Sequence, residues 1–139
     1  MTGARLAPAA LLVLLAVSAC GGPTDPSKNT IETFSGSVQP FSTGPVHSFN
    51  VPNTGEITVS VTAISPGNTF LGVGYGQLSG NNCGLIQQNV ASSANLGRTV
   101  LSGSIIIKGQ YCVVAFDPVG LTGTALTVPQ NYTVSVSHP

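Results

Sequence analysis

Charged side chains are scarce in this sequence. Among 139 residues there are 4 Lys and Arg and 4 Asp and Glu, which is 6% of the chain, whereas about a quarter of the residues in an ordinary soluble domain are charged. Nucleic-acid binding requires clustered cations that displace counterions from phosphates. The few cations here are scattered, so we expect no nucleic-acid partner.

Catalytic signatures are scarce as well. The sequence has no Gly-x-Ser-x-Gly, no His-Glu-x-x-His and no phosphate-binding lysine loop. His138 stands next to the C-terminal residue, a poor place for a rigid catalytic group. His47 shares strand parity with Phe49 and Val51, which favours a hydrogen-bonded structural role. A hydrolase would need His47 to contact both an acid and an exposed serine, so we expect no enzyme, no catalytic residue and no cofactor.

Apolar residues are present in the amount that a folded core requires. Leu, Ile, Val and Phe make up 40 of the 139 residues, well above the content of disordered chains. The remainder is rich in Ser and Thr, with 17 Gly and 10 Pro. This composition is typical of short strands joined by tight turns.

The chain opens with a short apolar segment. Arg5 precedes an apolar run over residues 6–17, which is too short to span a bilayer, because a spanning helix needs about 20 residues. The layout is that of a signal peptide. The run ends in Val-Ser-Ala-Cys at residues 17–20, which resembles the lipobox of bacterial lipoproteins. That resemblance implies a signal peptide over residues 1–19, cleavage before Cys20 and attachment of diacylglycerol to its thiol.

Ordinary cleavage by the general signal peptidase is the alternative, and it would cut the same bond after Ala19. It would leave Cys20 as an unpaired exported thiol, which is disfavoured. Two or three fatty chains on Cys20 would hold the protein durably on a membrane. Gly21 stands where Asp favours retention at the inner membrane in some bacteria, so we expect an exported protein anchored at the outer membrane or cell surface.

The rest of the chain divides into a tether and one domain. Residues 20–29 are rich in Gly, Pro and polar side chains, which predicts a flexible tether, and residues 30–139 have the length of one domain. Export to an oxidising compartment favours a disulfide between Cys83 and Cys112, with a free thiol pair as the alternative. A zinc site normally uses three or four N or S ligands, so we expect no metal site at these two cysteines.

Alternating apolar and polar residues predict β-strands, most clearly over 56–63, where positions 57, 59, 61 and 63 are apolar. The segment 110–117 is apolar on both faces, which predicts a central strand. Glycines on one face of 69–75 indicate a bulge or a close backbone approach. We found no helical periodicity. The expected fold is all-β, a jelly-roll-like antiparallel two-sheet β-sandwich of about eight strands, at 30–38, 46–51, 56–63, 69–75, 84–89, 99–107, 110–117 and 131–137.

The sequence contains Phe-Ser-Gly at 34–36, His-Ser-Phe-Asn-Val at 47–51, Gly-Glu-Ile-Thr-Val at 55–59, Gly-Gln-Tyr-Cys-Val-Val at 109–114 and Asn-Tyr-Thr-Val-Ser-Val at 131–136. These five motifs occur in the order seen in bacterial pre-peptidase C-terminal domains, which this chain resembles over most of residues 30–138. The resemblance implies a small β-sandwich of the kind appended to exported proteins. Some relatives bind calcium through clustered carboxylates, but Glu32, Glu56 and Asp117 are far apart in this sequence, so no metal site is carried over.

These observations lead to two functional expectations. The first is a non-catalytic, lipid-anchored protein of the cell envelope with a structural or adhesive role. The alternative is a surface accessory module that recognises a protein or glycan ligand through the loops expected at 89–97 and 117–129. Small side chains dominate both loops and Trp is absent from the chain, so they offer few of the usual binding anchors.

Overall fold

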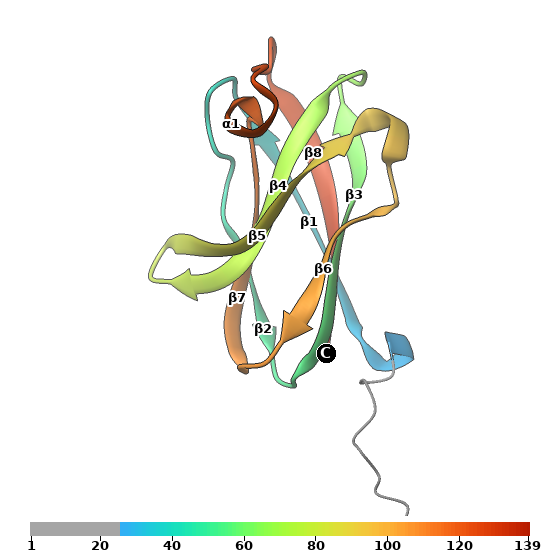
Figure 1. Ribbon diagram of the computed structural model, residues 1–139, viewed down its shortest axis with the longest axis vertical. Helices are drawn as coiled ribbons and strands as arrows, with labels where there is room; N and C mark the ends of the chain where they lie inside the picture. The colour runs from blue at the N-terminus through green and yellow to red at the C-terminus, as the bar shows by residue number, and fades with distance from the viewer. Residues whose placement is uncertain (1–25) are drawn as a thin grey trace, which may run out of the picture.

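Two four-stranded antiparallel sheets form the structure, a computed structural model that describes residues 26–139 (Figure 1). The expected signal peptide over residues 1–19 and Cys20 lie outside the described residues. The strands are β1 (Thr30–Val38), β2 (His47–Val51), β3 (Gly55–Ser65), β4 (Phe70–Ser79), β5 (Asn82–Ser92), β6 (Thr99–Ile105), β7 (Gly109–Phe116) and β8 (Gln130–His138), with short helical turns η1 (Pro26–Lys28), η2 (Ser93–Asn95) and α1 (Val119–Thr122).

The strand order is that of a jelly roll. The first sheet, called sheet A here, has the order β1-β8-β3-β6, and the second, sheet B, has the order β2-β7-β4-β5. The first strand therefore pairs with the last and each later strand with the one before the last pair. The pairs are β1 with β8, β2 with β7, β3 with β6, and β4 with β5. The predicted all-β sandwich with eight strands is confirmed.

The core lies between the sheets and is built by alternate residues of each strand. On β3 the inward side chains are Ile57, Val59 and Val61, all buried. The prediction that Ala63 continues this face is wrong, because a β-bulge shifts the register between Val61 and Ala63. The extra residue reverses the alternation, so Ile64 is buried in its place and Ala63 is exposed.

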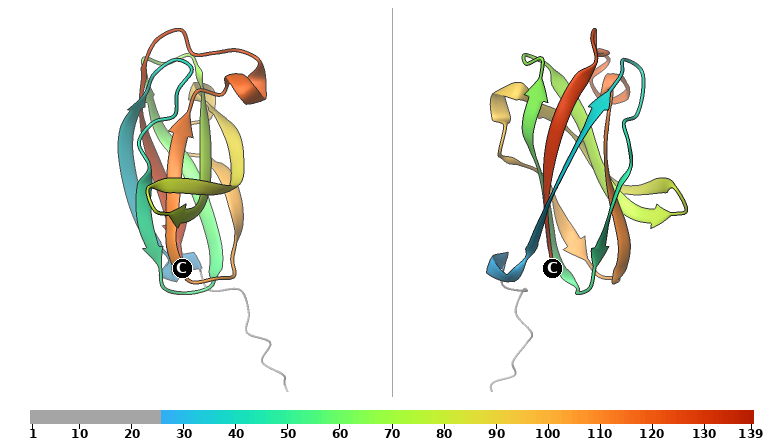
Figure 2. Two further views of the ribbon diagram at one scale, coloured as in Figure 1. Left: turned by 90° about the vertical axis from the view of Figure 1, so that its left-hand side faces the viewer. Right: turned by 180° about the vertical axis from the view of Figure 1, so that it is seen from behind.

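Sheet B differs from sheet A in that its outer face is partly covered. The β4–β5 hairpin bends across this face of the sheet to which it belongs (Figure 2). A side chain at Gly76 would overlap the carbonyl oxygen of Gly84, and the register shifts between Tyr75 and Gly76. The close approach predicted from the glycines of 69–75 is confirmed at Gly74, where a Cβ would lie 3.1 Å from the Gln87 carbonyl oxygen. Strand β5 runs on to Ser92, so the loop expected at 89–97 is shorter, since its first residues pair with β4.

Apart from the β4–β5 turn, which projects from the side, the connections between strands divide between two ends of the sandwich (Figure 2). The η1 turn, the C-terminus and the β2–β3 and β6–β7 connections lie at one end, which we call the proximal end. The β1–β2, β3–β4, β5–β6 and β7–β8 connections lie at the other, the distal end. Asn29, expected in the tether, is part of the fold, because its side-chain amide donates to the backbone oxygen of Glu56 at 3.3 Å and to the Ser137 hydroxyl at 3.2 Å.

Candidate functional site

The two cysteines of the domain are joined as predicted. Cys83 on β5 and Cys112 on β7 form a disulfide with a Cα–Cα distance of 5.7 Å. Strand β4 lies between β5 and β7 in sheet B, so the bond spans a strand and fastens the tip of the β4–β5 hairpin to the sheet. Cys112 is fully buried, which indicates a structural bond.

Asp117 organises the distal end. It follows the last residue of β7 and is buried. Its Oδ2 accepts hydrogen bonds from the backbone N–H of Phe41 at 2.6 Å and of Leu126 at 3.1 Å, and its Oδ1 accepts one from the N–H of Val119 at 3.0 Å. Hydrogen bonds to an ionised carboxylate are stronger than neutral ones. One side chain therefore holds the β1–β2 connection against two points of the β7–β8 connection.

The segments that Asp117 connects form a surface that we call the distal platform, residues 39–44 and 117–129. Besides the buried Asp117 these residues carry no charge. The one-turn helix α1, which the sequence did not predict, lies within it. The helix ends at Gly123, whose φ of 74° is the left-handed cap conformation and whose N–H donates to the Val119 oxygen. Asp117 thus fixes the start of this turn and Gly123 its end.

Phe41 is the most unusual residue of the distal platform. Its side chain is 77% exposed, and its φ of 58° is in the left-handed region that bulky residues avoid. Leu121 and Val128 of the same platform are also exposed. Strained residues held in place by their surroundings cluster at functional sites, so the platform is the candidate binding surface. The sequence pointed to its loop 117–129 but not to Phe41.

A hollow adjoins the distal platform. It has a volume of about 510 Å³ and reaches Thr122 of α1. Phe70 is an exposed aromatic ring on its wall, and Arg98 supplies a cation. Asn89 and Asn95 add amide groups, although the Asn89 amide already donates to the Val100 oxygen. This mixture of an aromatic, amides and a guanidinium is the kind of lining that binds a polar ligand.

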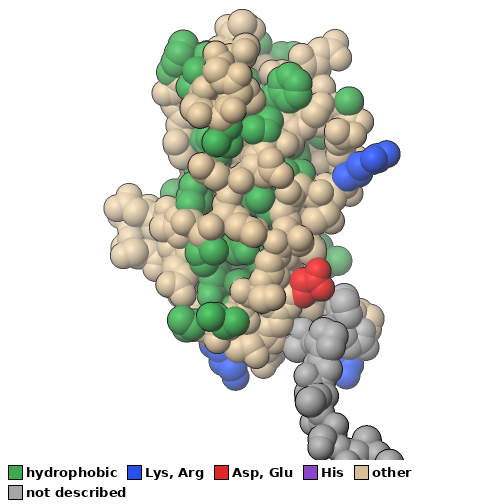
Figure 3. All heavy atoms as spheres, viewed as in Figure 1, with side chains coloured by type: hydrophobic (Ala, Val, Ile, Leu, Met, Phe, Trp, Pro, Cys, Tyr) green, Lys and Arg blue, Asp and Glu red, His purple; other side chains and the backbone are tan. Residues whose placement is uncertain are grey.

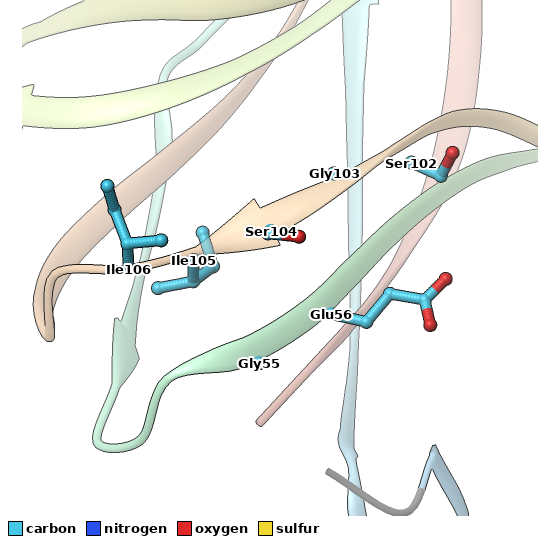
Figure 4. A pocket seen from close by; sticks show the side chains of 7 residues that line it. All are labelled: Gly55, Glu56, Ser102, Gly103, Ser104, Ile105 and Ile106. Carbon is cyan, nitrogen blue, oxygen red and sulfur yellow. The ribbon is translucent and has the colours of Figure 1, made fainter. Parts of the chain in front are cut away.

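Another hollow, of about 490 Å³, lies between β3 and β6 near the proximal end. Figure 4 shows that the Glu56 side chain points away from Ile105 and Ile106. Glu56 and Ser104 are paired across the two strands. One carboxylate and small hydroxyl groups give this hollow little with which to bind a specific ligand.

His47 is half-buried against Tyr132 and Phe34. Its Nε2 lies 3.1 Å from the Tyr132 hydroxyl, and its ring stacks on Phe34 at 5.2 Å. Burial lowers the pKa of His47 and raises the pKa of Tyr132 to about 12, so at neutral pH both side chains are uncharged. The contact is the structural hydrogen bond that the strand parity favoured.

His138 is held more firmly than its position next to the C-terminus suggested. Its Nε2 lies 3.0 Å from Glu32 Oε1, and its ring stacks on Phe49 at 5.1 Å. The side chain is buried. Its position next to the C-terminus therefore does not leave it loosely held, because β8 runs to His138 and pairs with β1 there.

No family model matches the chain. A comparison with curated proteins finds no similar sequence. Within residues 26–139 no three side chains of His, Cys, Asp or Glu come together in an arrangement that could hold a metal ion. No helix in the same part of the chain has the length and hydropathy to cross a bilayer.

Proposed function

We propose that the protein is a non-catalytic, lipid-anchored component of the bacterial cell envelope with an adhesive role, carried by the distal platform. The anchor is Cys20, as the lipobox-like residues 17–20 imply, and the membrane is the outer membrane, in keeping with Gly21. The jelly roll supports the relation to pre-peptidase C-terminal domains, because those domains are small β-sandwiches.

The presentation of Phe41 carries this proposal. An exposed aromatic side chain at positive φ contributes little to the core and costs backbone strain. Asp117 holds that strained backbone with a buried charge-assisted hydrogen bond. The platform lies at the end of the sandwich opposite the η1 turn, where the described chain begins (Figure 1). Anchoring upstream of that turn would direct the platform away from the membrane, toward other surfaces.

The test has two parts. Intact mass of the membrane-extracted protein reports lipid on Cys20, and retention of protein-displaying cells on polystyrene reports adhesion to an apolar surface. We expect F41N to lower retention about tenfold while leaving the free energy of unfolding equal or higher, because Asn tolerates positive φ.

The control variant is Ile31→Asn, which removes an exposed apolar side chain of β1 outside the platform and is expected to leave retention unchanged. Equal retention by wild type and F41N would contradict the adhesive role. An unmodified Cys20 would contradict the anchor.

The hollow beside Arg98 favours a second candidate function, an accessory module that recognises a glycan bearing a carboxylate. Arginine binds carboxylates through two parallel hydrogen bonds, and Phe70 offers a ring for a sugar face. Titration with acidic and neutral oligosaccharides, followed by hydrogen exchange over residues 89–99, tests this role. We expect acidic sugars to protect these amides in wild type and in the control K108Q, and not in R98Q.

A further inference from the structure

The β6–β7 turn at the proximal end carries two exposed isoleucines. Ile106 is 79% and Ile107 58% exposed, although aliphatic side chains of this size are usually buried. Lys108 follows them directly. The turn is short, since β6 ends at Ile105 and β7 begins at Gly109. It is therefore an apolar tip on a short connection between the two sheets.

This tip lies at the end of the sandwich where the described chain begins. Asn29 donates to the backbone oxygen of Glu56, and the neighbouring Gly55 pairs with Ile105 across β3 and β6. Figures 1 and 2 show the η1 turn and the β6–β7 turn at the same end. The start of the fold and the isoleucine tip therefore face in the same general direction.

The chain between Cys20 and Pro26 is short. It spans six residues, 20–25, and reaches about 20 Å when fully extended. A lipid on Cys20 would hold the proximal end within that distance of the bilayer surface. An apolar tip kept so close to a membrane meets lipid at a high effective concentration, so even a weak contact becomes populated.

We propose that Ile106 and Ile107 insert into the lipid leaflet to which Cys20 is attached, with Lys108 at the level of the headgroup phosphates. The proposal rests on the lipid anchor of the proposed function and adds an orientation of the domain on the membrane. Inserted apolar side chains with a flanking cation are typical of proteins that bind at the interface.

Because the charges at the proximal end nearly balance, apolar contact should supply most of the free energy of membrane binding. Lys28 and Lys108 are its cations, and Glu56 is an exposed carboxylate at the same end. Glu32 is paired with His138. Figure 3 shows hydrophobic and Lys or Arg side chains together at the lower end of the visible face. A nearly balanced set of charges gives little attraction to anionic lipid.

The absence of Trp from the chain makes a single-tryptophan experiment direct. The lipidated full-length mature protein is prepared as I106W and, for the distal end, as F41W, because these two sites are 79% and 77% exposed. Each is reconstituted into phosphatidylethanolamine and phosphatidylglycerol vesicles with or without brominated acyl chains. We expect about a twofold loss of fluorescence from brominated lipid for I106W and none for F41W, because an interfacial side chain lies about 5–10 Å into the boundary of the acyl chains.

Each other outcome overturns a defined step. Equal quenching of I106W and F41W in proteins that float with the vesicles overturns the insertion and leaves the anchor intact. Absence of flotation together with an unmodified Cys20 overturns both. I107W is the second reporter if I106W does not show a cooperative unfolding transition, and it must be quenched as I106W is expected to be.

Discussion

The outer faces of the two sheets differ in how far they are covered from solvent. In sheet A the central strands β3 and β8 are buried on the inner face, while their outer face is lined by Ser and Thr. In sheet B the central strands β4 and β7 are buried on both faces over most of their length. Sheet A therefore keeps the two-residue alternation of a half-solvated sheet, and sheet B does not.

The cover of sheet B comes from its own chain. The Leu85 side chain lies over Gly74, 2.9 Å from where a Cβ would be, and the Phe116 ring fills the space above Gly72. Glycine on the outer face of β4 removes the side chains that would otherwise keep the hairpin away. A sheet covered by its own hairpin thus depends on backbone contact, whereas sheet A depends on side-chain packing on one face.

The disulfide is expected to show the largest difference between the sheets. The double variant C83A/C112A should lose about 3.6 kcal/mol of unfolding free energy, because the bond closes a loop with a sequence separation of 29. Urea unfolding of the variant and of wild type measures the loss. Hydrogen exchange should rise first in residues 77–86 and later in sheet A. Uniform acceleration in both sheets would contradict the role of the bond as a fastener of the hairpin.

Gly76 is expected to show the next largest effect. G76A places a methyl group into the backbone of Gly84, so we expect a loss of about 2–3 kcal/mol in unfolding free energy from overpacking. The control is G67A, since nothing lies within 4 Å of a Cβ at Gly67, and it should change stability by less than about 0.5 kcal/mol. Similar values for the two variants in chemical denaturation would show that the backbone of β5 at Gly84 does not lie over Gly76 of β4 in solution.

The contrast between the sheets also explains how far the sequence could predict the fold. Alternation in β3 and β8 predicted their inner faces, with the error at Ala63 caused by a bulge that no composition signal marks. The apolar run of β7 predicted a central strand, and the glycines of β4 predicted close approach. What covers β4 could not be predicted, because Leu85 and Ile86 of β5 are exposed apolar residues with no alternation to follow.

The candidate site was less accessible to sequence analysis for a related reason. Asp117 acts on the backbone N–H of Phe41, 76 positions away, and an isolated Asp before a Pro predicts only a turn. Positive φ at a Phe has no signature in the sequence. His138 is likewise fixed by Glu32, 106 positions away. Contacts between residues so far apart in the sequence depend on how the strands are arranged and in which register they pair.

A pH dependence is expected where the two sheets meet, at His47 of β2 and Tyr132 of β8. Burial lowers the pKa of His47 from 6.5, so the folded protein binds fewer protons at this site than the unfolded chain. The stability that uncharged His47 contributes to the folded state is therefore fully present above pH 6.5, and it is lost as the pH falls below that value. Unfolding free energies of wild type and H47Q, measured from neutral to acidic pH, should converge at low pH. A constant difference would contradict the assignment.

The outer face of sheet A is expected to show the smallest effect. Ser60 lies on β3 opposite Ser135 of β8, outside the core and away from the hairpin. S60V should leave the free energy of unfolding within about 0.5 kcal/mol, or raise it slightly, because Val suits a strand and displaces nothing there. A loss of more than about 1 kcal/mol by the same denaturation assay would mean that this face is covered too. The proposed difference between an open and a covered sheet would then be wrong, since both outer faces would respond to added volume.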